Sequence, residues 1–235
     1  MTRMADRPAG AVPTWWPGLL GRVEALVGGR PVLVGVDGRS GVGKTDLALA
    51  AAELLVAAGH PTHVVHLDAL YPGWSGLAPA LPRLCVEVVA PLLAGRPGRY
   101  RSWDWDADRP GPPVVVPLRP VVVVEGVGTL ASPCASDFDV RLWLEAPAAV
   151  RRVRALARDG ETFAPHWDHW AEQEEAVLAA RPPWDALVDT VTGRTRWSVP
   201  GREGTADGAS AAAEESGAAA EESGTTGPGW DRLDP

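Results

Sequence analysis

The residues with the clearest chemical meaning form a glycine-rich segment in the first quarter of the chain. It fits the pattern G-x-x-x-x-G-K-[ST] without a gap, and its members are Gly38, Arg39, Ser40, Gly41, Val42, Gly43, Lys44 and Thr45. The glycines allow successive backbone N–H groups to point at phosphate oxygens, and the helix that begins near Lys44 adds the positive end of its dipole. The segment therefore predicts a phosphate-binding loop, with Thr45 as a ligand of Mg²⁺.

Lys44 is the only lysine in the sequence, because every other positively charged side chain is an arginine. Lysine is a compact and flexible point charge, whereas arginine presents a wide planar fork. The presence of lysine at this one position indicates a functional need for a mobile cation.

Acidic residues follow the apolar segments that we expect to form buried strands. Asp68 and Glu125 come directly after two such segments, and Asp37 lies just before the phosphate-binding loop. The carboxyl ends of parallel strands meet at the ligand-binding edge of a sheet. Asp68 is predicted to accept the proton of a substrate hydroxyl, and the alternative is that it caps the next helix. Glu125 is predicted to support Mg²⁺, and Asp37 competes with it for that role.

A segment between the strands, residues 98–113, brings aromatic, acidic and basic side chains together. The residues of interest are Trp103, Asp104, Trp105 and Arg109. Tryptophan faces can stack on a ring, and a carboxylate can bind two sugar hydroxyls. The segment predicts an acceptor-binding element, and the alternative is a surface hairpin whose tryptophans pack against the protein.

A basic helix is predicted at 146–160. Arg151, Arg154 and Arg158 follow one another at spacings of three and four, so they share one face of that helix. Such a face can close over a transferred phosphate as a lid. The alternative is an arginine face exposed to solvent.

Strand-like and helix-like segments alternate over most of the chain. The predicted strands lie at 31–38, 63–68, 121–126, 139–146 and 184–193. The predicted helices lie at 45–59, 81–95, 146–160 and 167–180. Strands joined by helical crossovers form a parallel sheet. The expected fold class is therefore α/β, with a doubly wound parallel sheet of about five strands, helices on both faces and a small helical lid.

The sequence divides into three parts. We expect a helical extension at 1–29, the phosphate-binding domain at 30–200 and a disordered tail at 201–235. The tail repeats AAAEESG at 211–217 and 218–224, and it lacks the large apolar residues that would anchor it to a core.

Composition excludes several classes of partner. Most of the net charge of −8 belongs to the tail, so no basic face indicates nucleic-acid binding. No apolar stretch is long enough to cross a membrane. Cys85 and Cys134 are too few for a disulfide framework or a thiolate zinc site, which favours a reduced, cytoplasmic compartment. Whether the chain forms a homo-oligomer is left open.

The order of these motifs resembles the uridine kinase and nucleoside-kinase-like group of P-loop kinases, over residues 31 to about 193. The shared features are the phosphate-binding loop, Asp-x-x-Tyr after the second strand, an aromatic-Asp-aromatic hairpin with a following Arg, Glu-Gly after the third strand, and an arginine-rich lid ending in Arg-Asp. The resemblance implies a P-loop NTPase fold and a kinase that transfers phosphate from ATP, with Mg²⁺, to a small-molecule acceptor.

The resemblance also implies a role for each candidate residue. Catalytic roles fall to Lys44, Asp68, Arg154 and Arg158. Acceptor contacts fall to Asp68, Tyr71, Trp103, Asp104, Trp105, Arg109 and Arg151. Support of the metal falls to Thr45 and Glu125. The group's Phe-Asp-His-Pro acceptor motif and its hairpin histidine are missing from this sequence, so the acceptor is left open.

The main alternative is a P-loop nucleotide-binding switch or ATPase that has no small-molecule acceptor. A guanine-reading Asn-Lys-x-Asp motif is ruled out because the sequence contains no asparagine. A degenerate module that binds nucleotide without turnover is a third hypothesis. Consumption of ATP that depends on an added acceptor distinguishes the kinase from both alternatives.

Overall fold

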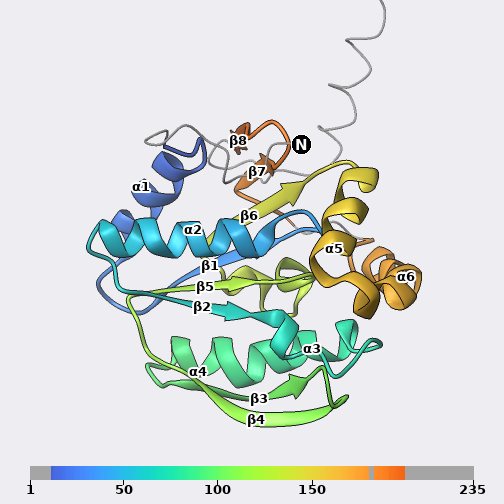
Figure 1. Ribbon diagram of the computed structural model, residues 1–235. Helices are drawn as coiled ribbons and strands as arrows, with labels where there is room; N and C mark the ends of the chain where they lie inside the picture. The colour runs from blue at the N-terminus through green and yellow to red at the C-terminus, as the bar shows by residue number, and fades with distance from the viewer. Residues whose placement is uncertain (1–11, 180–182, 199–235) are drawn as a thin grey trace, which may run out of the picture. The chain divides into compact units, whose positions relative to one another are not determined.

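The computed structural model describes residues 12–179 and 183–198, and a parallel sheet lies at its centre (Figure 1). In these residues six strands pair in the order β2-β5-β1-β6-β7-β8. Their bounds, in that order, are Thr62–His66, Val121–Glu125, Val32–Asp37, Val140–Glu145, Ala186–Asp189 and Thr195–Trp197. All neighbours are parallel except β7 and β8. The predicted α/β class with about five parallel strands is confirmed.

The central strands are buried because helices cover both faces of the sheet. β1 and β5 contain no exposed residue, which explains their unbroken apolar sequences. One face packs against α1 (Trp16–Leu26) and α2 (Lys44–Ala57). The other face packs against α3 (Leu77–Arg83) and the helical turns that follow it.

The predicted helix at 81–95 is divided into three pieces. α3 passes into a π-helical turn, Leu84–Val89, and then into α4, Ala90–Leu93. Pro91, at the start of α4, has no N–H and cannot donate a helical hydrogen bond. The wider turn before it is a local solution to that missing donor.

Two further pairs of elements lie beside the sheet. β3 (Gly98–Asp104) and β4 (Arg109–Val116) pair with each other as a separate hairpin, with a register shift between Arg101 and Trp103. α5 (Ala148–Phe163) and α6 (Trp167–Val177) lie near the carboxyl ends of the strands (Figure 1). The ends of α5 and α6 are joined by a short 3-10 turn, Ala164–His166.

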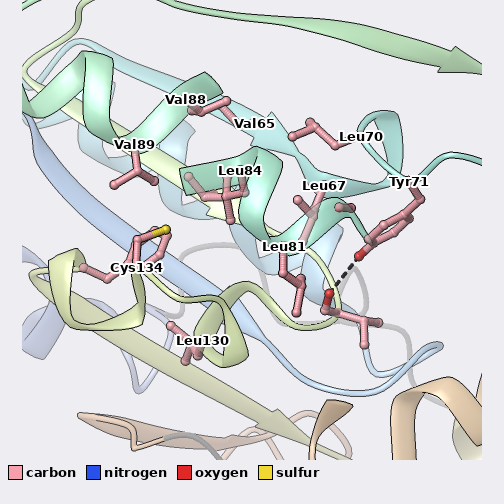
Figure 2. Packing of buried hydrophobic residues seen from close by; sticks show 14 of the residues in the cluster. Val65, Leu67, Leu70, Tyr71, Leu81, Leu84, Val88, Val89, Leu130 and Cys134 are labelled. Carbon is pink, nitrogen blue, oxygen red and sulfur yellow. Dashed lines mark hydrogen bonds between the residues drawn. The ribbon is translucent and has the colours of Figure 1, made fainter. Parts of the chain in front are cut away.

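Cys85 and Cys134 form a disulfide, which the sequence analysis did not anticipate when it favoured a reduced compartment. Cys85 in the π-helical turn and Cys134 after β5 are 49 positions apart, yet their Cα atoms are only 5.5 Å apart. The loop after β5 folds back onto the turn, where Cys134 lies close to Leu84 and Val89 (Figure 2). Sequence separation could not reveal this approach, because it depends on how β5 and the helical turn pack.

Helix α1 belongs to the segment that the sequence assigned to a helical extension. Trp15, Leu19 and Val23 are buried in the same cluster as α2 and the inner strands. At the other side of α1, the Arg22 guanidinium lies 4.1 Å from the centre of the Trp197 ring. The predicted disordered tail at 201–235 lies outside the described residues. No helix within 12–179 or 183–198 is long and apolar enough to cross a membrane.

Asp37 ends the central strand and joins it to the loop after β5. Its carboxylate accepts hydrogen bonds from the backbone N–H groups of Gly38, Gly128 and Leu130 at 2.6, 2.9 and 2.8 Å. The side chain is fully buried, and this burial raises its pKa to about 6 against the opposing effect of those hydrogen bonds and of Lys44. Both carboxylate oxygens therefore serve the backbone, which leaves Glu125 as the better candidate for supporting a metal.

We predict that Asp37→Asn lowers the free energy of unfolding by about 1–3 kcal/mol, because the amide has one acceptor oxygen and must turn its NH₂ group toward a buried backbone N–H. Urea unfolding measures the change. The matched control is Asp106→Asn at the exposed hairpin tip, which should be nearly silent. Equal stability of the two variants would contradict a structural role for Asp37.

A second prediction concerns two glycines of α1. A Cβ added at Gly18 would collide with the Trp197 ring, whereas a Cβ at Gly21 would meet nothing within 4 Å. Gly21→Ala should stabilise the protein by up to about 1 kcal/mol through helix propensity. Gly18→Ala should destabilise it by about 1–2 kcal/mol, because Trp197 must leave its place against α1. The opposite sign in urea unfolding of Gly18→Ala would show that α1 does not pack on β8 in this way.

Candidate functional site

The glycine-rich segment forms the connection between β1 and α2. Gly43 immediately precedes α2 and has a φ of 101°, a conformation that side-chain-bearing residues rarely adopt. At Gly38, with a φ of 145°, a Cβ would also press against the Leu144 carbonyl. The turn therefore requires glycine at both positions. Lys44 is 8% exposed, and its ammonium group donates to the Arg39 carbonyl at 3.3 Å, so the loop curls around its own lysine.

Thr45, His66 and Glu125 meet at the ends of three neighbouring elements. The Thr45 hydroxyl donates to Glu125 Oε1 at 3.1 Å, and His66 Nδ1 donates to the same oxygen at 2.7 Å. β2 and β5 are paired with His66 beside Glu125, which explains the second contact. The Glu125 side chain is only 3% exposed. The hydrogen bond between His66 and Glu125, together with the negative charge of Glu125, raises the pKa of His66.

Asp68 lies close to this group, in the 3-10 turn Leu67–Ala69. The side chain is in contact with solvent, yet the protein crowds around the carboxylate. This desolvation, reinforced by the negative charge of Glu125, raises the pKa of Asp68, and the charges of Lys44 and Arg158 act in the opposite direction. The alternative that Asp68 caps the next helix is wrong, because α3 begins at Leu77 and its N-cap is Gly76.

The three lid arginines have different surroundings although they share one helix. The Arg151 guanidinium donates to the Ser40 carbonyl at 3.2 Å and so contacts the phosphate-binding loop. Arg154 donates to the hydroxyl and the carbonyl of Thr190, after β7. Arg158 is exposed and pairs with Asp159 at 2.7 Å, and its charge acts on Asp68 and Glu125. Arg158 is thus the lid arginine with an electrostatic effect on the predicted base.

Among the predicted acceptor residues, Trp105 contacts the backbone of the predicted base. Its indole N–H donates to the Asp68 carbonyl at 3.0 Å. The ring of Trp103 lies beside Gly73, and its buried indole nitrogen has no hydrogen-bond partner.

Three other acceptor candidates occupy structural or exposed positions. Tyr71 is buried, and its hydroxyl donates to the Val127 carbonyl at 2.9 Å (Figure 2). The Asp104 carboxylate accepts from the Ala107 N–H within the hairpin turn. Arg109 is exposed at the start of β4, opposite Asp104. Tyr71 in particular has its polar group directed into the fold.

Sequence reasoning missed an aromatic cluster next to these residues. The Trp74 ring is stacked on His166 and on Phe163, with ring centres 4.3 and 5.4 Å apart, and it is tilted against Trp105 at 4.8 Å. The cluster joins the loop after β2, the hairpin and the α5–α6 segment. Its only sequence signal is a tryptophan in the glycine- and proline-rich stretch 72–76, which is not by itself a motif.

Comparison with known proteins gives concordant results. No protein-family model matches the chain. The uridine kinase of Bacillus licheniformis is 28% identical over 179 residues, which cover 69% of this chain and 82% of that protein.

Solved structures show the same type of fold. A protein of Silicibacter sp. TM1040 assigned as a fructose transport system kinase is 25% identical, with a TM-score of 0.56 over 73% of this chain and 95% of that chain. D-glycerate 3-kinase of Cryptococcus neoformans shares the fold at 13% identity, with a TM-score of 0.52 over 77% of this chain and 96% of that chain.

The phosphate-binding loop, the strand order and these similarities agree with one another. The uridine kinase of Bacillus licheniformis aligns with this chain over most of its own length. The central sheet and its phosphate-binding loop have the arrangement found in P-loop kinases. The chain therefore has the fold of P-loop kinases and is similar to small-molecule kinases of the uridine kinase-like group.

Proposed function

We propose that the chain transfers the γ-phosphate of ATP, together with Mg²⁺, to a hydroxyl group of a nucleoside-like or other small metabolite. This proposal is supported by the convergence of Lys44, Glu125 and Asp68 at the carboxyl edge of the sheet. The charges of Lys44 and Glu125 both act on Asp68. A nucleotide cation, a metal-supporting carboxylate and an accessible base are the groups that phosphoryl transfer requires.

The phosphate-binding loop would hold the nucleotide. Its backbone N–H groups and the start of α2 favour negative charge, and Lys44 would follow the γ-phosphate by leaving the Arg39 carbonyl. That carbonyl is a weak partner for an ammonium ion compared with a phosphate oxygen. The resting contact therefore keeps Lys44 close to where the phosphates would lie.

The residues present fit a magnesium ion. Thr45 and Glu125 offer a hydroxyl and a buried carboxylate, which are hard oxygen ligands. No group of three or more His, Cys, Asp or Glu side chains in the described part of the chain could hold a metal. Kinases usually bind Mg²⁺ through one or two carboxylates and the substrate phosphates, so such a group is not required. When bound, the ion would neutralise charge that develops on the transferred phosphoryl group.

Asp68 would act as the general base. Its solvent contact gives a substrate hydroxyl access, and its raised pKa brings its basicity closer to that of a group working near neutral pH. The hydrogen bond from Trp105 to the Asp68 carbonyl would hold the backbone that carries this carboxylate. Arg158 would supply positive charge from the lid.

The acceptor would lie between Asp68 and the aromatic side chains of the hairpin and lid. Trp105 and Trp74 provide flat apolar faces next to the proposed base. This supports a ring-containing hydroxylated acceptor, with Trp103, Asp104 and Arg109 of the hairpin as further candidates for contact. A cytoplasmic location is part of the proposal, since ATP is the phosphate donor.

The direct test is a screen of nucleosides, sugars and vitamins with MgATP, scored by release of ADP. We expect ADP release to depend on one class of added acceptor. ADP release at the same rate without any acceptor would instead favour the ATPase hypothesis. Binding of ATP with no turnover under any condition would favour the degenerate nucleotide-binding module.

We predict that Lys44→Ala lowers kcat by about 10²- to 10³-fold, by analogy with the loss of one preorganised charge donor at a transition state. Steady-state kinetics with the best acceptor measures this change. The control is Arg99→Ala, which removes an exposed cation on β3, together with thermal melts of both variants. Near-normal kcat for a folded Lys44→Ala variant would reject the assignment of the loop.

We predict that Asp68→Asn lowers transfer by about 10²- to 10⁴-fold, the range for loss of a general base. The amide has nearly the same size and is uncharged, so binding of MgATP by calorimetry should persist. Full acceptor-dependent turnover in this variant would remove Asp68 from the mechanism.

A further inference from the structure

The phosphate-binding loop is held from outside by a side chain that the proposed mechanism does not use. The Ser40 N–H donates to Glu174 Oε1 at 2.8 Å, although 134 positions separate the two residues. Glu174 lies in the middle of α6 and is only 2% exposed. A carboxylate buried to this extent destabilises a fold unless it has a partner. The hydrogen bond from the Ser40 N–H provides that partner for Glu174.

The carbonyl group of Ser40 is held as well. Arg151 of α5 donates to it at 3.2 Å and, through Nε, to the Ala146 carbonyl at 3.2 Å. The charges of Arg151 and Glu174 attract each other across the loop. Both polar backbone groups of Ser40 are therefore bonded to side chains of the α5–α6 segment, and neither is bonded within the strand-loop-helix unit.

The neighbouring residues extend this arrangement on both sides of Ser40. A Cβ on Gly41 would collide with the Arg151 carbonyl, so the backbone of α5 lies directly against the loop. On the other side, the Arg39 carbonyl accepts from Lys44. The position of residues 39–41 thus sets the resting position of the Lys44 ammonium group, and α5 and α6 set the position of residues 39–41.

We propose that Glu174 is a positioning residue for nucleotide binding: its hydrogen bond to the Ser40 N–H fixes the outer turn of the phosphate-binding loop, residues 39–41, in the conformation that receives phosphates. This inference rests on the proposed function. Preorganisation of a loop strengthens binding because less conformational freedom is lost when the ligand arrives. Glu174 does not act on the reacting atoms, so its loss affects nucleotide affinity more than the chemical step.

The adjacent Glu175 offers a matched control. Its carboxylate pairs with the Arg39 side chain at 2.6 Å, but it is 73% exposed and so is screened by solvent. Glu175 has the same charge as Glu174 and lies on the same helix, and it contacts the loop through the flexible side chain of Arg39.

The experiment measures the Kd of MgATP by calorimetry and the KM values of both substrates for Glu174→Ala, Glu174→Leu, Glu174→Gln and Glu175→Gln. In Glu174→Ala and Glu174→Leu we expect the Kd and KM of ATP to rise about tenfold, as expected for loss of a hydrogen bond to a charged group. The KM of the acceptor should stay within about twofold, and kcat at saturating ATP within about threefold.

Glu174→Gln should restore binding to within about threefold of the wild type, because its amide oxygen can still accept from the Ser40 N–H. Glu175→Gln should bind ATP as the wild type does. Thermal melts identify variants that fail to fold, and Glu174→Leu, which retains the bulk of the side chain, serves as the non-accepting variant if Glu174→Ala does not fold.

Three results would overturn the inference. Unchanged ATP affinity in the folded non-accepting variants would leave Glu174 with a purely structural role. Tighter ATP binding would mean that the carboxylate competes with phosphate. An equal loss in Glu174→Gln and Glu174→Ala would mean that the hydrogen bond is not the cause. Failure of the wild type to bind ATP would instead refute the proposed function, so the two failures are distinguishable.

Discussion

The buried carboxylate of Asp37 is the interaction on which the site depends. It connects the end of the central strand to Gly38, where the phosphate-binding loop starts, and to Gly128 and Leu130 in the loop that follows Glu125. Three backbone donors that would otherwise be unsatisfied in the core share one anion, whose burial raises its pKa. This arrangement fixes the loop after β1 relative to the loop after β5, and so fixes Lys44 relative to Glu125.

In the site next to Asp37, the positively charged side chains offset the negative charge of the carboxylates only in part. Desolvation raises the pKa of Asp68 and the nearby Glu125 carboxylate adds to this effect, while the positive charges of Lys44, Arg158 and His66 oppose it. Glu125 already accepts from both Thr45 and His66. A pair of neighbouring carboxylates favours the approach of a cation. The proposed role of Mg²⁺ follows from this electrostatic balance.

The α5–α6 segment contributes to the proposed site through two kinds of contact. Charged side chains of α5 and α6 bond to the backbone of the phosphate-binding loop at Ser40. Aromatic side chains at the junction of the two helices stack on Trp74, which in turn contacts the hairpin through Trp105. Gly160, with a φ of 53°, interrupts α5 between these two sets of contacts. The nucleotide end and the acceptor end of the proposed site are thus both shaped by the same pair of helices.

The sequence by itself determined the features whose physics is local. The phosphate-binding loop is one continuous segment whose glycines permit its turn, and unbroken apolar stretches such as 121–124 are typical of strands buried on both faces. The α/β class, the order of strands and helices and the positions of Asp68 and Glu125 at strand ends followed from these patterns. Only the tertiary structure decided which distant residues meet. The hydrogen bond of His66 to Glu125 depends on the register of β2 and β5, the Cys85–Cys134 disulfide on the packing of a loop over a π-helical turn, and the contact of Glu174 with Ser40 on how α6 docks. Each of these joins residues that are far apart along the chain, and a side-chain pattern within one segment has no information about its partner in another.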